Sequence, residues 1–395
     1  MPMVVQQSLG LAERLRALGP GRDVQVQDAM ARITLDVILT TGFDLPSNAV
    51  DLEQPCPLLE DMHFLMAETF RGFTNPFRKL YRKLAPNSAL AKEFSARLAN
   101  LHSIWHQIMT DVLARGEVAE DDVSLWGCLA KVRDHKTGKP LSGDLLQAEV
   151  AGIILGGLDT SAQTCAFTLA LLAAHPEQEE ALAAELDAAG LLATPANPSP
   201  RPMTFSDLPH LTYLDGVIKE SLRMFPVAAT GLSRCTDEDT VLCGYLIPAG
   251  TEVQVPIYTL HMTTFPEPER FLPQRWVDQH KATSDSTATK VHVQAEVRDT
   301  AAPKWTAAGA AREAGAAKPA PTFIPFSGGP RDCLGQRLAM MEVATILGTL
   351  LGRFTLELSP RMGGYSGLLE RQTIAFTLAV DDGLWINFKP RPGWV

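Results

Sequence analysis

The most constraining feature of the chain is a nearly uncharged apolar stretch in its middle, from Gln147 to His175, with the sequence QAEVAGIILGGLDTSAQTCAFTLALLAAH. Glu149 and Asp159 are its acidic residues, and it has no Lys or Arg. A helix that is apolar on all sides is buried in a core, because a surface helix keeps a polar face toward water. A membrane span is the competing interpretation, and Asp159 argues against it because a charge is costly in lipid. We therefore predict a long core helix.

The segments around this stretch predict a mainly helical protein. Residues 22–115 contain several runs with apolar residues three and four apart, and residues 176–190 and 208–225 also predict helices. Short strands are predicted in the segment 240–261 and in the late runs FTLEL, IAFTLAV and LWINFKP. We expect a mainly α fold with small β-sheets (α+β) in one domain, 1–395, with a low-complexity surface insertion at 278–320.

Charge and cysteine usage exclude several classes of protein. The net charge of −10 argues against nucleic-acid binding, which needs clustered Lys and Arg, and we expect no such cluster. The six cysteines lie far apart without a C-x-x-C pair, so neither a zinc site nor a disulfide framework is predicted, and a reducing, intracellular compartment is favoured. The first residues predict neither a signal peptide nor a membrane anchor.

The segment FIPFSGGPRDCLGQRLA, residues 323–339, surrounds a lone cysteine with features that favour its thiolate form. A predicted helix follows Cys333 and directs free N–H groups toward it, and Arg331 adds a positive charge. Gly329 and Gly335 let a flat partner approach the sulfur. One thiolate can be the sole protein ligand of a porphyrin iron, whereas zinc needs more ligands. The loop alone leaves open a buried cysteine that acts only as a small apolar side chain.

The same loop closely resembles the haem-binding loop of the cytochrome P-450 family, F-x-x-G-x-R-x-C-x-G, with Phe326, Gly329, Arg331, Cys333 and Gly335 at the defined positions. The resemblance implies a cytochrome P-450-like helical fold around haem b. It also implies that Cys333 is the axial ligand of the iron, that Arg331 pairs with a haem propionate, and that Phe326 packs beside the thiolate.

The segment GGLDTS within the predicted core helix supplies an acid and an alcohol. Gly156 and Gly157 weaken the helix, and the Thr160 hydroxyl can bond back to the Gly156 carbonyl or turn toward a ligand at a local break. Asp159 can feed protons through water. The segment resembles the family's A/G-G-x-D/E-T-T/S motif, which implies that Asp159 and Thr160 are catalytic. The plain alternative is a core helix weakened by glycine, with Asp159 in a salt bridge.

Glu220 and Arg223, in KESLR, share one helical face and alone indicate only a surface ion pair worth ~0.2–0.5 kcal/mol. They precede FPEPERFLPQRW, which resembles the family's P-x-x-F-x-P-x-R-W/F stretch. That order implies a buried structural cluster of Glu220, Arg223 and Arg275, with Arg270 as the second choice for its third member. The cluster would hold the segment that leads to the Cys333 loop. His261 matches a recurrent histidine of the family, but an ordinary surface or core histidine is an equal alternative.

The resemblance implies a monooxygenase that uses dioxygen to oxidise an apolar small molecule. Its electrons come from NADPH through a flavoprotein reductase, or from a ferredoxin. One alternative is a haem-thiolate isomerase or dehydratase acting on hydroperoxides, against which Thr160 argues. Another is a non-catalytic truncated remnant, because ARITLDVILTTGFD resembles a helix that lies well inside the family fold. The fold is therefore expected to be N-terminally incomplete.

Overall fold

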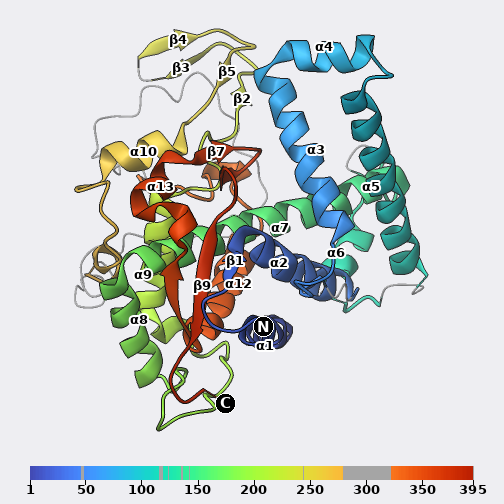
Figure 1. The fold of residues 1–395 in the computed structure, drawn as a ribbon. Helices are drawn as coiled ribbons and strands as arrows, with labels where there is room; N and C mark the ends of the chain where they lie inside the picture. Colours follow the sequence, from blue (N-terminus) through green and yellow to red (C-terminus); the bar gives the residue numbers. More distant parts are fainter. Residues whose placement is uncertain are drawn as a thin grey trace.

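The structure is a computed structural model that describes residues 1–45, 49–114, 119–122, 124–134, 137–141, 143–242, 244–278 and 322–394. Helix α7 (Gly143–Ala174) runs through the middle of the molecule (Figure 1). Every residue from 161 to 172 is buried, which confirms the predicted core helix. Its start lies four residues earlier than predicted. Within the described ranges, no helix is long and apolar enough to cross a membrane. The predicted insertion at 278–320 lies outside the described residues, except for Asp278.

Helix α2 (Val26–Phe43) packs along α7 and is almost entirely buried. The two helices approach closely at Gly157, where an added Cβ would lie 3.2 Å from Cδ1 of Ile38. On other sides of α7 lie α12 (Gln336–Leu351) and α9 (Thr212–Met224), while α1 (Pro2–Ala17) packs against α12 and α2. Further helices are α8 (Pro176–Ala188), α10 (Ile257–Thr264), α13 (Gly364–Glu370), and the short 3-10 helices η1 (Leu208–His210), η3 (Gly329–Arg331) and η4 (Pro360–Met362).

Helices α3 (Pro57–Thr74), α4 (Pro76–Leu84) and α5 (Ala89–Leu113) form an arm beside the core, with α6 (Leu125–Lys131) near its base (Figure 1). Local sequence sets the corners of this arm. The side chain of Asn75 accepts a hydrogen bond from the N–H of Phe77 at the start of α4, and Pro76 occupies the first turn, where its missing N–H costs nothing. Ser88 caps α5 in the same way.

Small antiparallel sheets complete the fold. The largest has the strand order β1 (Asp23–Gln25), β9 (Trp385–Pro390), β6 (Phe354–Leu358), with Ile386 opposite both Val24 and Leu358. The two-stranded sheets pair β2 (Arg234–Cys235) with β5 (Glu252–Val253), β3 (Thr240–Leu242) with β4 (Tyr245–Ile247), and β7 (Gln372–Ile374) with β8 (Leu378–Val380). The predicted class, mainly α with small β-sheets, is confirmed.

Two local predictions are wrong. The end of the strand-like segment 240–261 is helical, because α10 begins directly after Pro256, whose φ of −75° also suits a helix start. The run IAFTLAV was predicted as a single strand, but it forms the tip of the β7–β8 hairpin. Phe376 takes a positive φ of 112° at this tip and so reverses the chain.

Candidate functional site

The loop around Cys333 is shaped mainly by its backbone. The N–H of Cys333 donates a hydrogen bond to the carbonyl of Phe326 at 3.0 Å, which closes the loop. Ser327 and Gly329 have positive φ angles of 65° and 79°, and the 3-10 turn η3 follows. Helix α12 begins at Gln336, three residues after the cysteine. The thiol therefore stands just before the start of a helix.

The Cys333 thiol is free and its residue is exposed, so a buried apolar cysteine is contradicted. An added Cβ on Gly335 would lie 3.9 Å from Sγ of Cys333, in ordinary van der Waals contact, so Gly335 lies directly beside the thiol. Phe326 is half-buried against the core, while Arg331 is exposed and has no ion-pair partner among the residues that the structure describes.

The Cys333 thiol suits a metal whose other ligands belong to a cofactor. Among the described residues, no group of three or more His, Cys, Asp and Glu side chains could hold a metal ion. A single accessible thiol beside glycines, with an unpaired guanidinium two residues away, fits the iron and the acidic edge of a haem. The loop residues therefore fit this cofactor.

Helix α7 remains an α-helix through Gly156 and Thr160, so the local break expected at this point is absent. The Thr160 hydroxyl donates to the Gly156 carbonyl at 2.7 Å, a contact that adds to the helix without interrupting it. The two glycines have different surroundings. Gly157 is packed against Ile38, whereas a Cβ on Gly156 or on Gly152, one turn earlier, would meet nothing within 4 Å. One face of α7 is thus open at these small residues.

Asp159 faces a different part of the molecule from Thr160. Its buried carboxylate accepts a hydrogen bond from the Thr377 hydroxyl at 2.5 Å, and Nε2 of His63 lies 3.8 Å from its Oδ1. Thr377 comes from the β7–β8 hairpin and His63 from α3. Successive helical residues point about 100° apart, so the acid and the alcohol do not share a contact. No sequence signal connects Asp159 to Thr377, which follows it by 218 residues.

A cavity of about 280 Å³ adjoins the Asp159 carboxylate. Its walls come from the start of α2, from α3 and α7, and from the β7–β8 hairpin. Gln27 and Gln163 face each other across this region and form a hydrogen bond of 2.7 Å. The walls include His63 and Asp159 but not Thr160. The cavity therefore lies on the acid's side of α7, with both polar and apolar residues in its walls.

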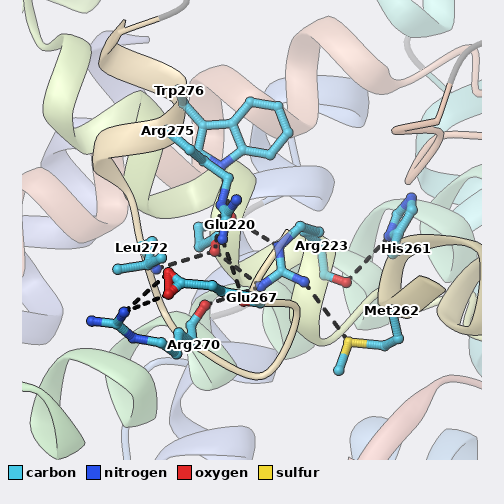
Figure 2. Close-up of polar contacts among 9 residues, drawn as sticks. All are labelled: Glu220, Arg223, His261, Met262, Glu267, Arg270, Leu272, Arg275 and Trp276. Carbon is cyan, nitrogen blue, oxygen red and sulfur yellow. Dashed lines mark hydrogen bonds and ion pairs between the residues drawn. The ribbon is translucent and has the colours of Figure 1, made fainter. Parts of the chain in front are cut away.

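Glu220, Arg223 and Arg275 form a buried cluster, drawn in Figure 2. Arg223 binds both carboxylate oxygens of Glu220, at 3.0 and 2.9 Å, and Nε of Arg275 binds Oε1 at 3.0 Å. Nε1 of Trp276 also donates to Oε2, at 2.9 Å. Arg270 is instead paired with Glu267 at the surface. The side chains of Glu220 and Arg223 are fully buried, so the surface ion pair considered from the sequence is excluded.

His261 connects this cluster to the Cys333 loop. Its Nδ1 lies 3.2 Å from the carbonyl oxygen of Arg223, and its Nε2 lies 3.1 Å from the backbone nitrogen of Ile324. Burial lowers the pKa of His261 to about 4, so the ring is neutral at pH 7. Because Ile324 donates to Nε2, the proton of the ring is on Nδ1 and bonds to Arg223. The sequence left open an ordinary histidine at the surface or in the core, and the burial of His261 excludes the surface position.

Glu342 is a buried acid that was not predicted from the sequence. Glu342 lies in α12, and its carboxyl contacts the Ser161 side chain of α7. Its Oε1 has no hydrogen-bond partner among the described residues. Burial raises its pKa to about 8. The only available sequence signal was a lone charge at the border of an apolar helical run.

The chain is similar to proteins of one large family. The family model described as "Cytochrome P450" matches residues 1–365. The "Cyclooctat-9-en-7-ol 5-monooxygenase" of Streptomyces melanosporofaciens is 28% identical over 91% of this chain and 68% of its own length. "Cytochrome P450 4V2" of Homo sapiens is 32% identical over 67% of this chain and 42% of its own length. "Cytochrome P450 3A29" of Sus scrofa is 27% identical over 85% of this chain and 59% of its own length.

Proposed function

Because the chain belongs to the cytochrome P450 family, we propose that it is a haem-thiolate monooxygenase that oxidises an apolar small molecule with dioxygen. The observation that carries this proposal is the exposed thiol of Cys333 in a loop whose residue spacing matches the family motif. The Streptomyces relative, which is a monooxygenase by name, supports the oxygen-inserting reaction.

Haem b would be held by the residues of the Cys333 loop. Cys333 would supply the thiolate ligand of the iron, Arg331 would pair with a propionate, and Phe326 would pack beside the thiolate. Gly329 and Gly335 add no side chain to the loop, and a Cβ on Gly335 would be in van der Waals contact with the sulfur at 3.9 Å. When bound, the haem supplies an iron that activates dioxygen, a reaction that thiolate ligation favours.

The loop is held ready for such a ligand by contacts that do not involve the cofactor. The hydrogen bond from Cys333 to the Phe326 carbonyl fixes the cysteine backbone. His261 holds Ile324, two residues before Phe326, to the end of α9. A neutral histidine and a buried ion cluster thus position the loop, and this is the structural role we propose for Glu220, Arg223 and Arg275.

Asp159 and Thr160 would handle protons from two different faces of α7. Asp159 lines the cavity that also contains His63 and Gln163, so its carboxylate can exchange protons with water there. The Thr160 hydroxyl is held by the Gly156 carbonyl beside the open glycine face. Transfer between them needs an intervening water or a change of side-chain rotamer, because they do not touch.

Electrons would come from NADPH through a flavoprotein reductase, or from a ferredoxin. Consumption of NADPH and dioxygen by the haem-loaded full chain, mixed with each type of donor and a panel of apolar small molecules, tests the reaction. We expect substrate-dependent consumption of both, with an oxygenated product. Turnover of a hydroperoxide without NADPH and dioxygen would instead show the isomerase or dehydratase reaction.

A further inference from the structure

Three buried side chains in the walls of the cavity beside Asp159 each leave one polar group without a hydrogen bond. Asp159, Gln27 and Gln163 are 3%, 8% and 7% exposed. Oδ2 of Asp159 accepts the hydrogen bond from Thr377, whereas its Oδ1 has no hydrogen bond to any described residue. The bond from Nε2 of Gln27 to Oε1 of Gln163 leaves the Gln27 amide oxygen and the Gln163 NH2 group without a partner in the described ranges. Buried polar groups are normally paired, so these groups suit a polar ligand in the cavity.

The charge in the cavity is unbalanced at Asp159. The His63 ring is the basic group near its carboxylate, but Nε2 of His63 lies 3.8 Å from Oδ1, too far for a hydrogen bond. The walls contain no Lys or Arg among the residues that the structure describes. Asp28, which also lines the cavity, is already paired with Arg32 at 2.7 Å. Because a buried carboxylate without a close cation is costly, the cavity favours a positively charged ligand.

The cavity also has apolar walls. Met66 of α3 lines it together with Ala375, Ala379 and Val380 of the β7–β8 hairpin. Its volume of about 280 Å³ is close to the lower limit of small-molecule pockets, ~300 Å³. A metal ion is a poorer fit, because the described part of the chain has no group of three or more His, Cys, Asp and Glu side chains that could hold one. The expected ligand is therefore a small organic cation with a short hydrocarbon part.

We propose that this cavity binds a small primary alkylamine in its protonated form. The ammonium donates one N–H to Oδ1 of Asp159 and another to the Gln27 amide oxygen, while the alkyl chain packs against Met66 and Val380. The two acceptors are neighbours, because Gln163, which binds Gln27, follows Asp159 by four residues on one face of α7. This binding goes beyond the proposed function and does not depend on haem.

Calorimetric titration of the full chain at pH 7 with hexylamine, 1-hexanol and hexyltrimethylammonium tests the proposal. Hexylamine is protonated at this pH, as a lysine side chain is. We expect it to bind at least about tenfold more tightly than either analogue, because the alcohol lacks the charge and the quaternary ammonium lacks N–H donors. Equal binding of hexylamine and either analogue, or no binding of hexylamine at concentrations up to about 10 mM, would overturn the proposal.

Three variants locate the bound amine. Asp159→Asn keeps the shape of the side chain without its charge, and should weaken hexylamine binding at least about tenfold while leaving 1-hexanol binding unchanged. Asp61→Asn is the matched control and should leave hexylamine binding unchanged. Asp61 is also buried, but its two oxygens are paired with Arg97 and Asn100, and it does not line the cavity. Ala379→Phe, at a half-buried position of β8, should fill the cavity and abolish hexylamine binding.

Full hexylamine binding in Asp159→Asn, or an equal loss in Asp159→Asn and Asp61→Asn, would overturn the proposal. Thermal unfolding by circular dichroism checks that each variant is folded. The comparison of the three ligands on the unaltered chain decides the proposal independently of the variants.

The absorption spectrum of the haem-loaded chain separates this site from the iron, which an amine nitrogen can also bind. We expect the Soret band to stay unchanged over the hexylamine range in which the heat of binding develops. A Soret shift that follows the heat of binding and persists in Asp159→Asn would place the amine on the iron and overturn the proposal. A chain that takes up no haem would contradict the proposed function alone, because the calorimetric comparison does not use the cofactor.

Discussion

Nε2 of His261 accepts a hydrogen bond from the backbone N–H of Ile324 at 3.1 Å, while its Nδ1 faces the carbonyl of Arg223. One neutral side chain thereby joins the buried ion cluster to the segment that enters the Cys333 loop. This relationship explains how the cluster can influence the cysteine without touching it.

Replacing His261 tests this link. The pKa of His261 is lowered to about 4 in the folded state, from about 6.5 in an unfolded chain. Its contribution to stability is therefore fully present above about pH 6.5 and is lost as the pH falls toward 4. We expect His261→Gln to remove about 2 kcal/mol at pH 7 and to flatten the loss of stability between pH 6.5 and 4. Urea unfolding at a series of pH values measures both effects, and an unchanged pH profile would contradict the assignment.

Arg275 and Arg270 lie five residues apart in the chain, and replacing each by alanine gives a matched comparison. Arg275→Ala leaves part of the buried Glu220 carboxylate without its partner, so we expect it to cost about 3 kcal/mol of unfolding free energy. Arg270→Ala removes only an exposed pair with Glu267 and should cost less than about 0.5 kcal/mol. Denaturant unfolding of the two variants decides the assignment, and a larger loss for Arg270→Ala would reverse it.

Gly156 and Gly157 should respond differently to alanine. Gly156→Ala meets nothing within 4 Å and should raise stability by about 0.5–1 kcal/mol through helix propensity. In Gly157→Ala the new Cβ would lie 3.2 Å from Ile38, so that gain should be offset in part or wholly. If the open face of α7 serves the reaction, Gly156→Ala should also lower turnover of the haem-loaded protein. Melting temperatures and turnover rates together show whether Gly156 is kept for function.

Glu342 should make the chain less stable as the pH rises. Its pKa is raised to about 8 by burial, from an ordinary value near 4.5, so the folded state retains a proton that the unfolded state has lost. Stability therefore falls from about pH 4.5 to pH 8. We expect Glu342→Gln to be more stable than the original chain by about 2–4 kcal/mol at pH 7, and equal to it near pH 4. Urea unfolding at the two pH values compares them, and a destabilised Gln variant at pH 7 would show that the carboxyl is ionised and paired.

The parts of the fold that depend on local pattern could be predicted from the sequence. An all-round apolar stretch defines α7 because a long helix without a polar face has to be buried. The composition around Cys333 pointed to its chemistry because the required glycines and arginine are neighbours in the chain. The spacing of Glu220 and Arg223 identified a pair on one helical face, though not its burial.

Contacts made across the fold could not be predicted in the same way. The direction of the Asp159 carboxylate depends on Thr377 in a distant hairpin and on His63 in α3. Helix α4 turns Phe77 toward solvent, while Arg78 of the same helix binds a buried glutamate of another helix, Glu68. In both cases the polar partner is brought in by tertiary packing, and residue spacing alone carries no such information.

The most direct test of the central claim is the absorption spectrum of the haem-loaded, reduced chain with carbon monoxide. Thiolate ligation by Cys333 predicts a Soret band at about 450 nm. The band should be lost in Cys333→Ala and kept in Cys235→Ala, which alters another exposed free cysteine. Persistence of the band in Cys333→Ala, or its absence from the original chain with haem bound, would contradict the assignment of Cys333 as the iron ligand.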